Sequence, residues 1–290
     1  MTSRYIDTNS IKLHLMEAGP ADGPLVILLH GFPEFWYGWR KQIEALAAAG
    51  YRVWAPDQRG YNLSDKPPGI HSYRIDTLAA DIAGLINAAG VEKAFLVGHD
   101  WGGAVAWWVA AHYPQRLHKL AILNMPHPDV MARFVRTHWR QTVRSWYILF
   151  FQLPGLPEWL AARDQFSLFA RTLRGTSRPG TFSRADLNEY RKAWAQPGHG
   201  GQPAIRTMIH WYRAAIQKRP SGKHEKRITV PTLLLWGTGD SFLLKEQAEP
   251  SLARCDHGKL VFFENTTHWI QHEEPARVSE ELLAFFDRTD

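Results

Sequence analysis

The sequence predicts an α/β fold in which a mostly parallel sheet carries helices on both faces and a helical segment is inserted into the chain. Three observations lead to this prediction. Short apolar runs alternate with amphipathic segments up to residue 126, only helical periodicity follows for about a hundred residues, and strand-like runs return from residue 228. We therefore expect a core formed by residues 1–126 and 226–290, with a helical insertion over residues 127–225.

The first strands differ in how their apolar residues are spaced. Residues 11–18 (IKLHLMEA) alternate polar and apolar side chains, as in a hairpin strand. Residues 25–29 (LVILL) are continuously apolar, which is typical of a strand covered on both faces. A helix candidate ends at Gly50 and leads into a further strand, residues 51–56 (YRVWAP).

The next elements repeat the same order of strand and helix. Residues 75–90 place their apolar side chains on one helical stripe, and residues 94–97 (AFLV) form a short apolar run. A second helix over residues 102–113 precedes a strand at residues 117–124 (LHKLAILN). Strands that alternate with helices in this way predict a parallel sheet.

The second part of the core is shorter than the first. Strand-like runs occur at residues 228–237 (ITVPTLLLWG) and 259–264 (KLVFFE), and a helix closes the chain over residues 275–286. Between the two parts, residues 145–159 (SWYILFFQLPGLPEW) form the most aromatic stretch of the helical insertion.

Composition limits the kinds of protein that this chain can be. Its 290 residues are 45% hydrophobic, enough for one large core, but no run approaches roughly 18 uncharged apolar residues. The opening MTSRYIDTNS lacks the basic and then apolar order of a secretory signal, so we expect a cytoplasmic protein. Cys255 is the only cysteine, which excludes an internal disulfide and a multi-thiolate metal site. We expect neither a metal nor an organic cofactor.

The net charge of +6 is unevenly distributed. Residues 127–225 contain 16 Lys and Arg against 6 Asp and Glu, a net of +10, while the rest of the chain has a net of −4. Such asymmetry can mark a surface for nucleic acid or anionic lipid. Because the cations alternate with apolar residues at helical spacing, ordinary solvated helix faces are favoured, and we expect neither nucleic acid nor membrane as a partner.

The sequence GHDWGG, residues 98–103, joins a predicted strand to a predicted helix. Gly98 and Gly102 suit a tight turn in which larger residues would collide with the neighbouring backbone. Asp100 stands at the apex, where the positive end of the following helix favours an anion. Taken alone, Asp100 is equally typical of a helix N-cap.

A second turn follows the strand at residues 25–29 and begins with His30, Gly31, Phe32 and Pro33. Open α/β sheets place their ligand crevices at such strand ends. The turn can direct the backbone N–H of Phe32 toward the first turn, where it would pair with the N–H of Trp101 as an oxyanion hole. We expect His30, Gly31 and Pro33 to have structural tasks only.

Two further polar residues follow the strands of the second core part. Asp240 comes directly after residues 228–237, and His268 lies in the loop after residues 259–264. Many histidines in loops are simply solvated, so His268 carries little information by itself. The order of nucleophile, acid and histidine, each after a strand, is the serial arrangement of α/β-hydrolases.

Over essentially its full length the chain resembles the epoxide-hydrolase branch of the α/β-hydrolase superfamily. The matching stretches are HGFPEFWYGWR, DQRGYNLSDKP, GHDWGGAVAWWVA, WGTGD and THW. The resemblance implies Asp100 as nucleophile, His268 as general base and Asp240 as the acid that orients it. It also implies an eight-stranded sheet, a cis peptide at Phe32–Pro33, and a cap formed by residues 127–225.

The implied reaction is the hydrolysis of a small apolar epoxide to a vicinal diol. An ionised Asp100 attacks a saturated carbon and forms an alkyl ester. Water activated by His268 then attacks the ester carbonyl, while the N–H groups of Phe32 and Trp101 hold the oxyanion.

The epoxide oxygen must gain a proton, and a tyrosine hydroxyl is a suitable donor. The stretch HWYRAA resembles a cap motif of the family and nominates Tyr212. The chain departs from the family where Phe150 stands in place of the first cap tyrosine. Tyr147, one helical turn earlier, could face the same way.

Two other functions remain open at this point. A dehalogenase would use the same Asp100 but needs N–H donors for the halide. Many haloalkane dehalogenases take one donor from an asparagine, and Phe32 stands at that position here. A second donor could still come from a cap tryptophan. Trp101 disfavours a haloacid dehalogenase. A non-catalytic binding protein on the same fold would use the stretch SWYILFF as a docking surface. The particular substrate and the oligomeric state stay open.

Overall fold

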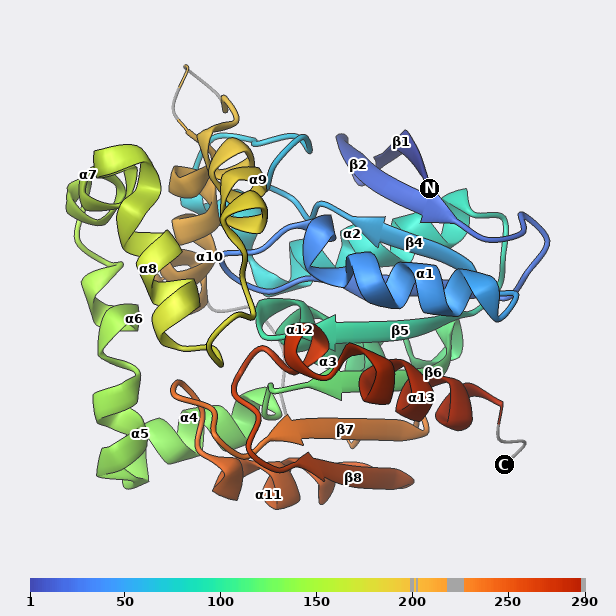
Figure 1. The fold of residues 1–290 in the computed structure, drawn as a ribbon. Helices are drawn as coiled ribbons and strands as arrows, with labels where there is room; N and C mark the ends of the chain where they lie inside the picture. The colour runs from blue at the N-terminus through green and yellow to red at the C-terminus, as the bar shows by residue number, and fades with distance from the viewer. Residues whose placement is uncertain (199–200, 202, 218–226, 288–290) are drawn as a thin grey trace.

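The computed structural model describes residues 1–198, 201, 203–217 and 227–287, and over these residues the chain forms one eight-stranded sheet (Figure 1). The strands lie in the order β1-β2-β4-β3-β5-β6-β7-β8. Strands β1 and β2 pair antiparallel, β2 and β4 pair antiparallel, and all other neighbours are parallel. The bounds are β1 Thr2–Thr8, β2 Ile11–Ala18, β3 Leu25–Leu29, β4 Arg52–Pro56, β5 Ala94–His99, β6 Leu117–Leu123, β7 Thr232–Gly237 and β8 Gly258–Phe263. The predicted mostly parallel sheet is confirmed.

Helices cover both faces of the sheet, as predicted. Helices α1 (Arg40–Ala48) and α13 (Pro275–Phe286) pack on one face, and α2 (Ile75–Ala88) and α3 (Trp101–His112) pack on the other (Figure 1). All five residues of β3 are buried, because successive side chains enter the two layers in turn. This explains why β3 is continuously apolar.

The described part of residues 127–225 is helical and lies between β6 and β7 in the chain. Its helices are α4 Pro128–Thr137, α5 Trp139–Arg144, α6 Trp146–Phe150, α7 Leu156–Ala162, α8 Ser167–Gly175, α9 Arg184–Ala195 and α10 Ala204–Gln217. The arrowheads of β5 and β7 point toward this group of helices (Figure 1). The predicted boundary between residues 225 and 226 lies outside the described residues. Two short helices complete the core, α11 Ala248–Leu252 and α12 Ile270–Glu273.

Tryptophan side chains of the helical segment are hydrogen-bonded to loops that leave the strands. Trp194 on α9 donates its indole N–H to the Pro33 carbonyl at 2.6 Å, and Trp211 on α10 donates to the Arg59 carbonyl at 3.0 Å. Both indoles are almost fully buried. The helical segment is therefore fixed to the loop after β3 and to the loop after β4.

Strand β1 is the element that the sequence does not predict. It pairs with β2 from Thr2 opposite Glu17 to Thr8 opposite Ile11. Most of its side chains are exposed, since it is an edge strand with little apolar contact on either face. Without a buried face, its sequence lacks the apolar alternation by which strands are recognised.

Candidate active site

The turn after β5 places Asp100 in an unusual backbone conformation. Strand β5 ends at His99, α3 begins at Trp101, and Asp100 between them has φ +49° and ψ −123°. Non-glycine residues rarely adopt a positive φ, and such strain persists only where the surroundings impose it. The Asp100 side chain is 15% exposed at the apex of the turn.

Three predicted glycines allow this turn to form. A Cβ at Gly98 would lie 2.4 Å from the Gly102 carbonyl oxygen, and a Cβ at Gly102 would lie 2.2 Å from the Leu29 carbonyl oxygen. A Cβ at Gly31 would lie 2.6 Å from Oδ1 of Asp100 itself. Any larger residue at these positions would therefore displace backbone or the Asp100 carboxylate.

The loop after β3 reaches the Asp100 carboxylate directly. The backbone N–H of Phe32 donates to Oδ1 of Asp100 at 2.7 Å. The peptide bond between Phe32 and Pro33 is cis, as the resemblance implied. One predicted oxyanion donor is thus already within hydrogen-bonding distance of the carboxylate. The second, the N–H of Trp101, is the first amide of α3 and follows Asp100 in the chain.

His30 is buried and holds this loop in place. Its Nδ1–H donates to the Gly31 carbonyl at 3.0 Å, and its Nε2 accepts from the backbone N–H of Gln58 at 3.1 Å. Because one ring nitrogen donates and the other accepts, the ring is neutral. Burial lowers the pKa of His30 and agrees with this assignment. These contacts match a structural task.

His268 lies between two carboxylates. Its Nδ1 is 2.7 Å from Oδ2 of Asp240, and its Nε2 is 3.6 Å from Oδ2 of Asp100. Asp240 and His268 are both buried. Asp100, Asp240 and His268, which the turn motif, the strand order and the family resemblance pointed to, are therefore in one site.

The two carboxylates decide the protonation of His268. Burial lowers the pKa of the imidazole, but the charges of Asp240 and Asp100 outweigh burial and raise it to about 10. Burial raises the pKa of Asp240, but the charge of His268 and the hydrogen bonds that Asp240 accepts keep this pKa below its usual range. The resting site therefore contains an imidazolium flanked by two carboxylates.

Asp240 is held by groups that the sequence did not reveal. The side-chain amide of Asn124 donates to Oδ2 at 2.7 Å, and the backbone N–H groups of Phe242 and Leu243 donate to Oδ1 at 2.7 and 3.0 Å. Asn124 follows β6 and also accepts from the Gly237 amide at 3.0 Å. The position of Asn124, a polar residue directly after a buried strand, was the signal in the sequence that could have identified it.

Tyr147 and Tyr212 lie together on the helical side of the site. Their ring centroids are 5.9 Å apart, and the Tyr212 ring is 5.1 Å from Phe32 and 5.0 Å from Trp101. Burial raises the pKa of Tyr212 well above its ordinary value, and Tyr147 and Asp100 raise it further. Burial and the charges of Asp100 and Asp240 also raise the pKa of Tyr147. Both hydroxyls therefore stay protonated beside the carboxylate.

Glu34 forms a second buried cluster that the sequence did not single out. It accepts from the Tyr190 hydroxyl at 2.7 Å and from Nε2 of His272 at 2.6 Å, and Nδ1 of His99 lies 3.2 Å away. Nε2 of His99 donates to the His268 carbonyl at 2.8 Å. Burial opposes ionisation, but the two histidines keep the pKa of Glu34 well below its usual range. The cluster thus fixes the backbone of His268.

The site combines a partly exposed carboxylate, a histidine paired with a second carboxylate, amide donors and an apolar surround. Aromatic rings of Phe151 and Phe242 border the tyrosines, 4.9 Å from Tyr212 and 6.0 Å from Tyr147. Among the described residues there is no group of three or more side chains suited to bind a metal ion. Such a site can form and hydrolyse a covalent ester.

The fold and this arrangement define the class of protein. The sequence profile of the α/β-hydrolase fold family matches residues 24–275, so the chain belongs to this family. The predicted fold class is confirmed.

Individual relatives narrow the position within the family. The chain is 46% identical over 282 residues to the AB hydrolase superfamily protein YfhM of Bacillus subtilis, covering 97% of this chain and 96% of that one. It is 36% identical over 290 residues to epoxide hydrolase 1 of Caenorhabditis elegans, covering 99% and 70%. The crystal structure of Bacillus megaterium epoxide hydrolase with an inhibitor is similar with a TM-score of 0.86 and 29% identity, over 98% and 100% of the chains. The resemblance to epoxide hydrolases is confirmed.

Proposed function

We propose that this chain is an epoxide hydrolase that converts a small apolar epoxide and water to a vicinal diol through an ester on Asp100. The observation that carries the proposal is the position of the Asp100 carboxylate. It stands on a strained turn, accepts the Phe32 amide at 2.7 Å and lies 3.6 Å from the base His268. Relatives that bear the name epoxide hydrolase support the same substrate class.

In the first step, an Asp100 oxygen attacks an epoxide carbon. The carbon–oxygen bond of the ring breaks, and the leaving oxygen takes a proton from Tyr212 or Tyr147. Hydroxyls with a raised pKa are weak acids, but they stay protonated and can donate to the alkoxide as it develops. The products of this step are an uncharged ester of Asp100, which carries the hydroxyl of the opened ring, and the phenolate of the tyrosine that gave its proton.

In the second step, water attacks the ester carbonyl of Asp100. Ester formation removes one of the two negative charges that raise the pKa of His268, so the imidazolium can release one proton, which restores the tyrosine hydroxyl. Neutral His268 then accepts a proton from water while Asp240 holds Nδ1. The Phe32 amide, already bonded to Oδ1, stabilises the oxyanion. The bond between the Asp100 carboxyl carbon and the substrate oxygen then breaks, and that oxygen takes the proton of the new carboxylic acid. The diol is released, and Asp100 is again a carboxylate beside a protonated His268.

The tryptophans of the helical segment disfavour a dehalogenase. A halide site of that kind needs a free indole N–H above the nucleophile. The indoles of Trp194 and Trp211 donate to backbone carbonyls, and Trp139, Trp146 and Trp159 are exposed. In the described part of the helical segment, the tyrosine hydroxyls are therefore the donors near Asp100.

We also propose that residues 127–225 act as the cap over this site, with residues 1–126 and 226–290 as the core. Tyr147 on α6 and Tyr212 on α10 support this division, since both face residues of the core. The cap would supply the proton donors, and the core would supply the nucleophile and the base.

The proposal is tested by trapping the ester. In the His268→Gln variant, Asp100 can still open an epoxide, but no base activates water. Incubation with a panel of epoxides and halogenated alkanes, followed by intact-protein and peptide mass spectrometry, should show an adduct on Asp100 with the mass of a whole epoxide. An adduct that has lost a halogen would make the chain a dehalogenase. If no compound forms an adduct on Asp100, the proposal fails and a non-catalytic binding protein becomes the favoured function.

The tyrosines are tested by removing their hydroxyls. Tyr212→Phe is expected to slow epoxide opening by on the order of 10²-fold, because a general acid contributes roughly that much. The double variant with Tyr147→Phe should be slower still. Single-turnover rates of ester formation measure the effect, and Tyr5→Phe, an exposed tyrosine of β1, is the control. Unchanged rates in the double variant would remove both tyrosines from the mechanism.

A further inference from the structure

The outer face of the helical segment exposes an uncommon number of large apolar side chains. Among the described residues, twelve large hydrophobic side chains are exposed, and nine of them lie between residues 139 and 216. Trp139, Trp146 and Leu149 are the most exposed of these nine, at 75%, 64% and 69%. Exposed apolar patches of this kind mark interaction sites in folded proteins.

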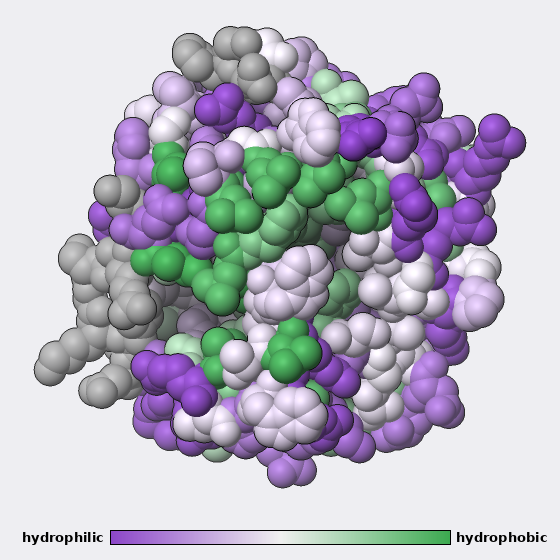
Figure 2. Space-filling view, turned by 90° about the vertical axis from the view of Figure 1, so that its left-hand side faces the viewer, coloured by the Kyte–Doolittle hydropathy of each residue, from purple (hydrophilic) through white to green (hydrophobic). Residues whose placement is uncertain are grey.

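These side chains form one stripe. Trp139, Val143, Trp146, Leu149 and Leu153 follow one another at steps of three or four residues along α5, α6 and the turn after them. Such steps keep side chains on one side of a helical path. Helices α5 to α7 form the outer edge of the molecule in Figure 1, and Figure 2 shows green aliphatic and pale aromatic side chains on this face with purple ones around them. We call these five residues the apolar stripe.

Cations surround the apolar stripe, and most nearby carboxylates already have partners. Arg133, Arg136, Arg163 and Arg171 are exposed on α4, α8 and the turn between α7 and α8. Arg140 is exposed on α5 itself and lies 3.6 Å from the exposed carboxylate of Glu246. The carboxylates Glu158 and Asp129 are partly buried and paired with Arg213 and Arg254. The outer face therefore presents apolar and cationic groups together.

We infer that the apolar stripe and the arginines around it dock this protein on an anionic membrane surface. Tryptophan favours the boundary between lipid and water, and arginine next to it pairs with anionic headgroups. A second copy of the chain fits less well, because it would bring together two segments that each have a net charge of +10. None of the described helices is both long and apolar enough to cross a bilayer, so the contact is peripheral.

The position of the stripe connects docking to the candidate site. Trp146 is exposed on α6, and the next residue, Tyr147, turns inward to Tyr212. Docking would hold the helical segment against lipid, the phase in which small apolar molecules concentrate. The expectation of no membrane contact rested on the spacing of the cations, whereas the exposure of the tryptophans between them becomes visible only in the structure.

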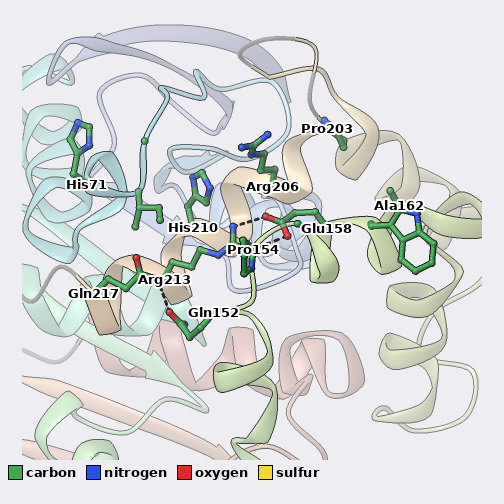
Figure 3. Close-up of a pocket in the computed structure, with 14 residues that line it drawn as sticks. His71, Gln152, Pro154, Glu158, Ala162, Pro203, Arg206, His210, Arg213 and Gln217 are labelled. Atoms are coloured by element: carbon green, nitrogen blue, oxygen red, sulfur yellow. Dashed lines mark hydrogen bonds and ion pairs between the residues drawn. The ribbon is translucent and has the colours of Figure 1, made fainter.

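The cleft in Figure 3 is a different feature and is not part of the proposed surface. It is lined by Arg206, His210, Arg213 and Glu158 from α10 and α7, and Arg213 forms an ion pair with Glu158 at its centre (Figure 3). The ion pair at its centre distinguishes this cleft from the apolar stripe on α5 and α6.

The test uses the purified full chain and sedimentation with vesicles. Vesicles of phosphatidylcholine with phosphatidylglycerol should bind the protein, vesicles of phosphatidylcholine alone should bind it at least tenfold less, and salt should weaken the binding. The triple variant Trp139→Ser/Trp146→Ser/Leu149→Ser should lose on the order of tenfold or more in binding. Arg136→Gln and Arg140→Gln should each weaken it about fivefold.

Matched controls separate docking from damage to the fold. Tyr5→Ser/Leu63→Ser removes two exposed apolar side chains far from the stripe in sequence and should bind as the parent chain does. All variants should keep the parent's thermal unfolding midpoint. The proposal is overturned if the parent binds neither kind of vesicle, if the stripe and arginine variants bind normally, or if gel filtration shows a dimer that the triple variant dissociates.

Discussion

Replacing Asp100 with Asn is expected to lower epoxide turnover by on the order of 10⁵-fold, the scale on which loss of a nucleophile acts. The amide has nearly the shape of the carboxylate, so the turn and its contact with Phe32 should persist. It lacks the negative charge that attacks carbon. The loss should appear in the rate of ester formation, measured in single turnovers, and no adduct should form even in combination with His268→Gln.

The control for this variant must exclude slow conversion of Asn back to Asp. Intact mass before and after each assay shows whether the amide persists. Asp76→Asn, at a partly exposed carboxylate paired with Arg74, should retain full activity. If Asp100→Asn keeps more than about a hundredth of the parent's turnover with its amide intact, the nucleophile is another residue.

Replacing Asp240 with Asn is expected to slow hydrolysis of the ester by on the order of 10⁴-fold, the effect known when the acid of a triad becomes an amide. Asp240 raises the pKa of His268 and accepts from its Nδ1. All groups that contact the Asp240 carboxylate are donors, including the Asn124 amide on the oxygen that faces His268. The NH2 group of an asparagine at this position would therefore meet other donors on one side. His268 would then be held in the wrong tautomer.

This variant separates the two chemical steps. Asp100 remains ionised, so opening of the epoxide should continue and the ester should accumulate to near one equivalent in the steady state, as seen by rapid-quench mass spectrometry. Asp256→Asn, at a carboxylate paired with Arg227 on the surface, serves as the comparison. A normal rate with no accumulated ester would show that Asp240 does not support the base.

The order of the core elements was predictable because their physical signals are strong. Strand β3 is apolar throughout since both of its faces are buried. The glycines around Asp100 are required because a Cβ at these positions would lie little more than 2 Å from neighbouring atoms. Asp240 and His268 each follow a parallel strand, and parallel strands end at one edge of the sheet. Their meeting with Asp100 therefore follows from topology.

The remaining features depend on contacts between distant segments. Asn124 and Glu34 act through partners more than a hundred residues away, such as Asp240 and His272, so no local pattern marks them. The aromatic stretch at residues 145–159 could equally have been buried. Its apolar spacing is the same in either case, and only the packing of α5 and α6 shows which side chains face outward.

The indole of Trp194 has a consequence for how enzymes of this kind can diversify. Its bond to the Pro33 carbonyl ends one residue from the Phe32 amide that holds Asp100. A chimaera that receives the helical segment of another family member would thus receive a different support for the loop that contacts Asp100. Exchange of such segments between lineages should succeed mainly where an indole N–H of the new segment donates to the carbonyl equivalent to that of Pro33.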